Sequence, residues 1–198
     1  MTKATQSLLL TLVLAGVVFV LVNTSFQNFQ VEGTSMTPNI QDGQFILVNK
    51  AAYRRVNLGP VSDWLPFLDR NGDGYVEPFG EPERGQVVIF ELESQPGRKF
   101  IKRVIGLPGE TIEVRPGGMI FVNGVHLDES YLPRLGNKLV QPLVVPPNEY
   151  FVMGDERVRS FDSRDWGTLP RGNIIGKAWF SYYPFGEAGL VETLEPEF

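Results

Sequence analysis

The 198-residue sequence contains no cysteine and only one histidine, and each absence excludes a class of chemistry. Without cysteine, the chain has no disulfide bond, no thiol nucleophile and no thiolate ligand for a metal. One histidine rules out metal sites that are built from several imidazoles. Basic residues are also outnumbered, 18 against 23 acidic ones, for a net charge of −5. This balance does not favour nucleic acid as a partner, and we expect none.

A long hydrophobic run lies near the N-terminus, from Leu8 to Val22. Extended to Phe26 it has 19 residues. As a helix it would be about 28 Å long, close to the thickness of the hydrocarbon core of a bilayer. A cleaved signal peptide is the alternative, but the run is long for one and no small-x-small cleavage site follows it. We therefore expect residues 1–26 to contain a retained single-pass anchor in the cell membrane.

The charges that flank this run predict its orientation. Lys3 is the only basic residue before the run, and Glu32 is the first charged residue after it. Cytoplasmic flanks of membrane helices are enriched in Lys and Arg. We therefore expect the N-terminus in the cytoplasm and the rest of the chain on the exocytoplasmic side.

Short apolar runs separated by Gly, Pro and Asp predict a mainly β domain over residues 27–198. No amphipathic helical period is evident there. The dipeptide Asn123-Gly124 predicts a hairpin with a type I′ turn. Residues 51–83 and 124–147 are less regular, and we expect them to be excursions from the sheet. The expected strands are Phe45–Val48, Val87–Leu92, Phe100–Ile105, Thr111–Val114, Met119–Val122, Tyr150–Met153 and Ile174–Tyr182.

If the chain is a hydrolase, the choice of its general base is narrow. His126 directly follows a predicted hairpin turn, a place typical of a solvated strand edge. Arginine cannot be deprotonated, so a lysine is the remaining base for a serine nucleophile. Lys102 alone among the lysines lies in a strongly apolar strand pattern, on one face with Phe100 and Val104. Burial there would lower the pKa of its amine, although a lysine at a strand edge can instead extend to water.

Ser35 is the candidate nucleophile, within Glu-Gly-Thr-Ser-Met-Thr-Pro. Gly33 allows a close backbone approach to a ligand, and Pro38 stiffens the exit from the turn. Because Ser35 follows Phe26 by nine residues, it stays within about 30 Å of the bilayer. Loops of this composition are common, so the segment alone is weak evidence for catalysis.

A third segment, residues 153–167, alternates acidic residues with arginines. It is consistent with a solvated surface loop. It is equally consistent with a salt-bridged loop that braces a site. The pattern leaves both interpretations open.

Taken together, these segments resemble bacterial type I signal peptidases, the membrane-anchored Ser/Lys endopeptidases that remove signal peptides. The resemblance covers nearly the whole chain, with four motifs in the family's order behind the hydrophobic run. They are Gly-x-Ser-Met-x-Pro (33–38), Arg-Gly-Gln-Val-Val-Ile-Phe (84–90), Lys-Arg-Val-Ile-Gly-Leu-Pro-Gly (102–109) and Gly-Asp-x-Arg-x-x-Ser-x-Asp-Ser-Arg (154–164). The resemblance implies an antiparallel β catalytic domain that cleaves preproteins without a metal or cofactor.

The resemblance also implies roles for individual residues. Ser35 matches the nucleophile, with its backbone N–H in the oxyanion hole, and Lys102 matches the general base. Ser160 matches a hydroxyl that hydrogen-bonds to the lysine and orients it. Two supporting ion pairs are implied, Asp162 with Arg164 and Asp155 with Arg103.

The same motif matching implies a specificity and a set of partners. Met36 and Ile101 match residues that line shallow apolar pockets for small side chains at substrate positions −1 and −3. The implied partners are preprotein signal peptides, the lipid bilayer and nearby protein export machinery. Gly33 stands where some members carry a serine as the second oxyanion donor, which leaves that donor open. Three other positions also depart from the family's usual residues: Asn39, Glu110 and Glu156.

The resemblance does not account for residues 69–74, which read Asp-Arg-Asn-Gly-Asp-Gly. Asp69, Asn71 and Asp73 match ligand positions 1, 3 and 5 of a calcium loop, but position 12 is Gly80 instead of Glu. A turn rich in Asp and Asn that binds no ion is the alternative, and we favour it.

Two other functions remain to be distinguished. A self-cleaving regulatory protein shares the Ser/Lys pair but normally carries a DNA-binding module, and nothing in this sequence resembles one. A non-enzymatic, calcium-stabilised binding module anchored in the membrane would leave Ser35 and Lys102 without a catalytic role. Inhibitor labelling separates these functions, because only the enzyme would acylate Ser35 and need Lys102 to do so.

Overall fold

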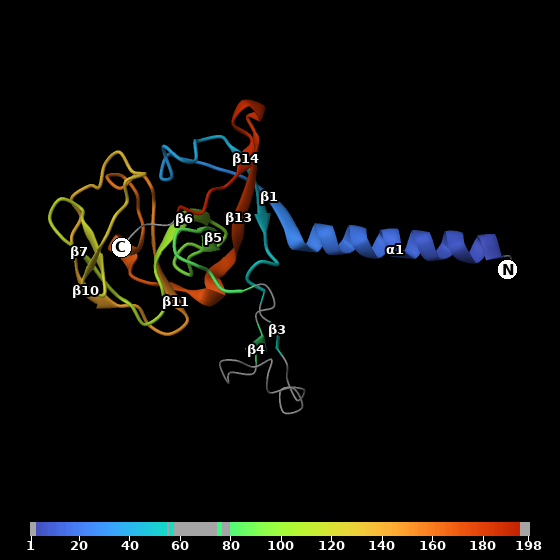
Figure 1. Ribbon diagram of the computed structural model, residues 1–198, viewed down its shortest axis with the longest axis horizontal. Coiled ribbons are helices and arrows are strands. Elements are labelled where there is room, and N and C mark those ends of the chain that lie inside the picture. The colour runs from blue at the N-terminus through green and yellow to red at the C-terminus, as the bar shows by residue number, and fades with distance from the viewer. Residues whose placement is uncertain (1–2, 55, 58–74, 77–79, 195–198) are drawn as a thin grey trace.

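The computed structural model describes residues 3–54, 56–57, 75–76 and 80–194. Helix α1 (Lys3–Ser25) projects as a rod from a body made of strands (Figure 1). Within it, Gln6–Ser25 has a mean hydropathy of 2.3, and the helix is long and apolar enough to cross a membrane. Residues 6–24 are all exposed, which suits a helix that packs against lipid. Phe26, expected within the anchor segment, instead begins the first strand.

Most strands form one antiparallel sheet with the order β1-β2-β13-β5-β6-β11-β12, and β14 pairs with β13. In β5, Val87 and Ile89 pack on one face while Val88 and Phe90 pack on the other. Both faces are therefore covered, as the uninterrupted apolar sequence of this strand requires. The bounds are β1 (Phe26–Gln30), β2 (Phe45–Asn49), β5 (Val87–Glu91), β6 (Lys99–Gly106), β11 (Glu149–Met153), β12 (Leu169–Pro170), β13 (Ile174–Tyr183) and β14 (Gly189–Leu190).

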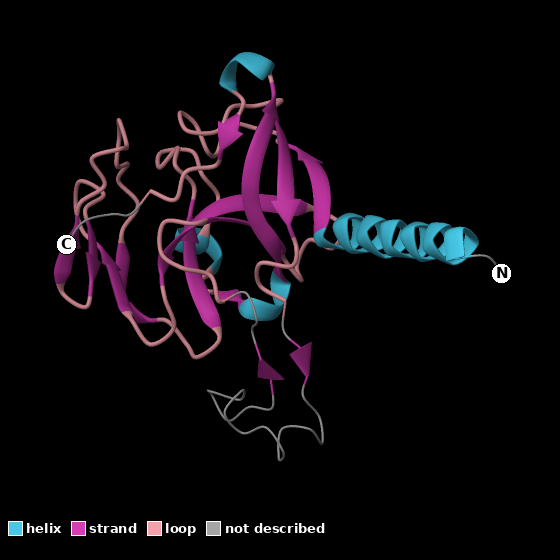
Figure 2. Cartoon of the chain, turned by 45° about the vertical axis from the view of Figure 1, so that its right-hand side comes forward, coloured by secondary structure: helices cyan, strands magenta, loops and turns pink. Residues whose placement is uncertain are grey.

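A smaller antiparallel sheet has the order β10-β7-β8-β9 and lies on the side of the large sheet away from α1 (Figure 2). It packs on the large sheet through an apolar cluster that includes Ile105, Phe151 and Met153. Asn123 and Gly124 have φ angles of 52° and 83°, so the predicted type I′ turn joins β8 to β9. The bounds are β7 (Thr111–Val114), β8 (Ile120–Val122), β9 (Val125–Leu127) and β10 (Val140–Val144).

All seven expected strands are present, with ends within one residue of the prediction. Residues 124–147, expected to be an excursion from the sheet, supply β9 and β10 to the smaller sheet and no strand to the large one. In residues 51–83, the structure describes a short pair of strands, β3 (Val56–Asn57) and β4 (Tyr75–Val76). The remaining short elements are one-turn helices: α2 (Ser163–Trp166), η2 (Arg171–Asn173) and η3 (Phe185–Glu187).

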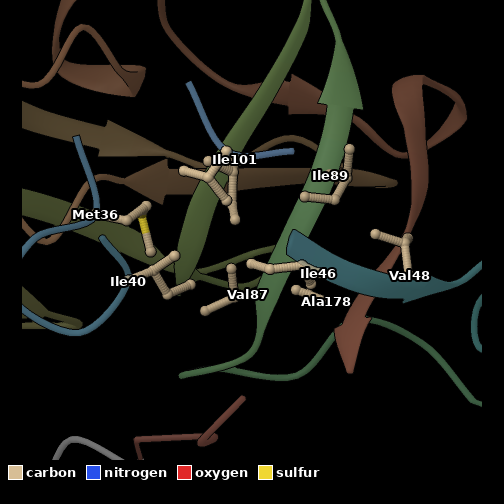
Figure 3. Packing of buried hydrophobic residues seen from close by; sticks show 9 residues of the cluster. Met36, Ile40, Ile46, Val48, Val87, Ile89, Ile101 and Ala178 are labelled. Atoms are coloured by element: carbon tan, nitrogen blue, oxygen red, sulfur yellow. The ribbon is translucent and has the colours of Figure 1, made fainter. Parts of the chain in front are cut away.

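One of the apolar clusters of the large sheet lies directly under the loop between β1 and β2 (Figure 3). Met36 and Ile40 extend from this loop toward Val87 of β5 and Ile101 of β6, and all four side chains are at most 9% exposed. The loop is thus fixed to the sheet by buried apolar contacts from residues that closely follow Ser35. This attachment holds Ser35 beside β6.

Candidate active site

Ser35 lies in the loop that joins β1 to β2. The base of this loop is closed by the Val31 N–H, which donates to the Gln44 carbonyl oxygen at 2.8 Å. Gly33 has a φ of +92°, a conformation that other residues rarely adopt, and its N–H donates to Asp42 Oδ1 at 2.7 Å. The turn leaves Ser35 only partly buried, and Ser35 lines the groove described below.

Lys102 lies in β6 and is 3% exposed, so its side chain does not extend to water. Its Nζ lies 2.7 Å from Ser35 Oγ and donates to the Ile101 carbonyl oxygen at 2.8 Å. This separation between amine and hydroxyl is short enough for direct proton transfer. The structure therefore brings together the serine and lysine that the sequence singled out.

Burial lowers the pKa of Lys102 from 10.5 to about 8, because the desolvated ammonium is disfavoured. The carboxylates of Asp162 and Asp155 oppose this effect, since each favours the charged amine. Near pH 8 about half of the Lys102 side chains are then neutral, and a neutral amine can accept a proton from a serine.

A buried ion pair near Lys102 joins Asp162 to Arg164. Arg164 Nε and Nη2 donate to the two Asp162 carboxylate oxygens at 2.8 and 2.7 Å, and neither side chain is exposed. The Gly154 N–H also donates to Asp162, at 3.0 Å. Burial favours the neutral carboxyl, but bonds from Arg164 and Gly154 outweigh it and hold the pKa of Asp162 below its ordinary value. Asp162 also caps α2, accepting a bond from the Arg164 backbone N–H.

Arg103 follows Lys102 in β6 and forms a two-bond ion pair with Asp155. Its Nε and Nη2 donate to the Asp155 carboxylate at 3.0 and 2.7 Å, and the two side chains are at most 1% exposed. The structure thus contains both ion pairs that the resemblance implied.

Ser160 departs from its implied contact. Its Oγ is buried, and among the described residues no hydrogen bond joins it to Lys102; the Ser160 hydroxyl instead helps to lower the pKa of Asp162. The implied bond to Lys102 is therefore not formed, because the amine contacts Ser35 and the Ile101 carbonyl instead. Ser160 nevertheless lies close by, since a Cβ placed on Gly154 would be 2.2 Å from its Oγ and 2.4 Å from the Ser35 carbonyl oxygen.

Two residues that sequence reasoning did not single out support this loop. Gly154 allows the close approach just described, and its only sequence signal was its place in the fourth motif. Glu129 forms a buried ion pair with Arg157, and each side chain is at most 1% exposed. Glu129 lies in the stretch that was expected to be an excursion, so no pattern in the sequence pointed to it.

A groove of about 970 Å³ opens at the Ser35–Lys102 pair. Its walls include residues 29–35 on one side and 96–102 on the other. Ile101 lines the groove, as expected of a pocket residue. Met36 does not, because its side chain is fully buried and packs into the apolar cluster below the loop (Figure 3). The role of Met36 at a substrate pocket, which the resemblance implies, stays a prediction.

The remaining candidates of the sequence lie elsewhere. Asp69, Asn71 and Asp73, the calcium candidates, are outside the described residues. Within the described ranges, no group of three or more His, Cys, Asp or Glu residues is placed to hold a metal. His126 is exposed on β9, where its ring packs against Phe121 with 5.4 Å between ring centroids.

A lysine that deprotonates near pH 8 in contact with a serine hydroxyl supplies the base that a serine nucleophile requires. In an antiparallel β body with a groove of peptide size, this arrangement defines a serine–lysine hydrolase. Comparison with known proteins agrees. The family model described as "Signal peptidase, peptidase S26" matches residues 4–183.

Relatives named signal peptidase I are similar to this chain over most of its length. The protein of Leptolyngbya laminosa is 39% identical, covering 66% of this chain and 69% of the relative. That of Pseudomonas aeruginosa is 33% identical, covering 84% and 69%, and that of Bacillus caldolyticus is 32% identical, covering 81% of both. The chain belongs to the signal peptidase family, peptidase S26. The resemblance and the serine endopeptidase class are confirmed, and the calcium-stabilised binding module has no support.

Proposed function

We propose that this chain removes N-terminal signal peptides from exported preproteins, cutting after small residues at positions −3 and −1. The observation that carries the proposal is the 2.7 Å contact between Ser35 Oγ and Lys102 Nζ, together with the burial that lowers the pKa of Lys102 to about 8. Ser35 is the proposed nucleophile and Lys102 the proposed general base.

In the first step, neutral Lys102 accepts the hydroxyl proton of Ser35 while Oγ attacks the carbonyl carbon of the scissile peptide bond. The Ser35 backbone N–H stabilises the oxyanion that forms. The Lys102 ammonium then donates its proton to the leaving amine nitrogen, the C–N bond breaks, and the mature protein is released. An ester between Ser35 and the signal peptide remains.

In the second step, Lys102 is again neutral and accepts a proton from a water molecule that attacks the ester carbonyl. The ester bond breaks, and the proton returns from Lys102 to Ser35 Oγ. The signal peptide leaves with a new carboxyl terminus, and the enzyme regains its starting state. The chain's own side chains move every proton in both steps.

The groove walls suit an extended peptide. Among the described strands, β1 is an edge strand of the large sheet, and β6 pairs with β11 only from Arg103 onward. The strand edges beside the groove can therefore bond to a substrate backbone in β-augmentation. Ile101, at the groove surface, would contact a small substrate side chain near the scissile bond.

The anchor helix places this chemistry beside a bilayer. Nine residues, 26–34, separate the end of α1 from Ser35. We place the N-terminus in the cytoplasm and the catalytic domain, residues 27–198, on the exocytoplasmic side, where the export machinery releases preproteins. The proposed partners are therefore signal peptides, the lipid bilayer and that machinery.

The test is cleavage of a precursor with Ala at −3 and −1 by the detergent-solubilised full chain. We expect wild type to cut after the −1 residue, and Ser35→Ala and Lys102→Ala each to lower kcat/KM by about 1,000-fold or more. Ser94→Ala, which alters an exposed serine outside the groove lining, is the matched control and should cut normally.

A second precursor, with Asp at −1, should resist cleavage, since a small apolar site disfavours an unpaired charge. No cleavage by folded wild type, or equal cleavage by the Ser35→Ala variant, would overturn the proposed function.

A further inference from the structure

The proposed catalytic pair comes from two segments that are distant in sequence. Ser35 lies in the β1–β2 loop, and Lys102 lies 67 residues later in β6. Proton transfer depends on a heavy-atom separation that is set to within tenths of an ångström. Contacts between the loop and the strand must therefore maintain it.

Asp155 lies between the two segments and contacts both. It accepts the two bonds from Arg103, the residue next to Lys102. It also accepts a bond from Asn39 Nδ2, which donates to Asp155 Oδ2 at 2.9 Å. Asn39 lies four residues after Ser35, at the other end of the nucleophile turn.

A backbone bond completes this connection. The Glu156 N–H, next to Asp155, donates to the Ser35 carbonyl oxygen at 3.1 Å. The segment 155–156 therefore binds the nucleophile turn at its start, through the Ser35 carbonyl, and at its end, through Asn39. Arg103 Nη1 also donates to the carbonyl oxygens of Gly85 and Glu192, at 2.6 and 3.1 Å, so three residues hold the guanidinium in place.

We propose that Asn39 is a positioning residue, whose amide fixes the end of the Ser35 turn to the Asp155–Arg103 pair and thereby sets Ser35 against Lys102. The proposal rests on the Ser/Lys function proposed above. Asn39 does not line the substrate groove but a second cavity of about 450 Å³, which Arg103 also lines. Its loss should therefore lower kcat and leave KM unchanged.

The experiment measures kcat and KM of the full chain for the Ala-x-Ala precursor in wild type, Asn39→Leu and Asn39→Asp. Asn39→Leu keeps the side-chain size but removes the donor to a buried carboxylate, and we expect kcat to fall about 3- to 10-fold at constant KM. Asn137→Asp, at an exposed loop position, makes the same charge change as Asn39→Asp and should match wild type.

Asn39→Asp supplies a pH readout that a general loss of packing would not give. The introduced carboxyl faces the Asp155 carboxylate, so its pKa is raised, and only its protonated form can donate to Asp155. The ratio of kcat for Asn39→Asp to kcat for wild type should therefore increase as the pH is lowered. The same ratio for Asn39→Leu should not change with pH.

A constant-KM loss in Asn39→Leu together with the acid-side gain in Asn39→Asp supports the proposal. Wild-type kcat in Asn39→Leu, a rise in KM at unchanged kcat, or a pH-independent ratio for Asn39→Asp overturns it. Each of these outcomes requires an active wild type that Ser35→Ala inactivates, so failure of the proposed function itself is recognised separately.

Discussion

The loop of residues 153–167 and the smaller sheet differ in how deeply their ion pairs are buried. Among the described residues four ion pairs involve this loop: three are buried, with every side chain at most 1% exposed, and only Lys138–Asp165 lies at the surface. In the smaller sheet the pair between Glu113 and Arg115 lies at the surface, with the side chains 26% and 43% exposed. The interior beneath that sheet is an apolar cluster.

This difference distinguishes the apolar contacts that stabilise the fold from the buried ion pairs that position the residues of the site. The smaller sheet packs on the large one through apolar side chains, with no buried ion pair among the described residues of that cluster. Buried ion pairs add little net stability, because desolvation offsets much of the attraction, and apolar residues of similar volume often serve as well. Their concentration beside Lys102 is instead explained by the need to hold a buried amine next to Ser35.

The largest effect on stability is expected from Asp162→Ala. This change leaves the buried Arg164 guanidinium without its carboxylate and the Gly154 N–H without its acceptor. We expect the free energy of unfolding to fall by about 3–5 kcal/mol, measured by denaturant unfolding in detergent. Glu113→Ala, which removes a carboxylate from an exposed pair, should give no measurable shift in the unfolding midpoint. Equal effects of the two changes would contradict the comparison.

Lys102→Met should raise the free energy of unfolding, and by less than Asp162→Ala lowers it. The lowering of the Lys102 pKa from 10.5 to about 8 means that folding disfavours its charged form, by up to about 3 kcal/mol below pH 8. An apolar side chain of similar length removes this cost. The variant should therefore be inactive yet more stable than wild type by about 1–3 kcal/mol.

The pH dependence of this gain follows from the same shift. Between pH 8 and 10.5 the unfolded state binds more protons at this position than the folded state, so wild-type stability rises with pH. The advantage of Lys102→Met should thus be largest below pH 8 and shrink toward pH 10.5. A variant that is less stable than wild type at pH 7 would show that the buried amine stabilises the fold.

The fold could be predicted from the sequence wherever strands are apolar and bounded by turn residues. β5 and β6 have this character, and their bounds were correct to one residue. β1 (Phe-Gln-Asn-Phe-Gln) and β10, with a proline inside it, do not, because edge strands tolerate polar residues and irregular bonding. Their pairing depends on tertiary partners that a local pattern does not reveal.

Site residues could be predicted from the sequence where a residue type was unexpected for its surroundings. A lysine inside an apolar strand pointed to Lys102, whereas the charges of the 153–167 loop resembled a solvated surface until the structure showed that Asp155, Arg157 and Asp162 are buried. The depth of Met36 and the partner of Asn39 depend on how the nucleophile turn packs on the sheet. Neither follows from residue type or spacing.

The most direct test of the Ser35–Lys102 account is the pH dependence of kcat/KM for precursor cleavage, which reports ionisations of the free enzyme. Since the neutral amine is the active form, kcat/KM should rise about tenfold per pH unit on the acid side and level off above an apparent pKa of about 8. A rise that continues toward the ordinary lysine value of 10.5, or no dependence between pH 6 and 9, would contradict a buried Lys102 acting as the general base.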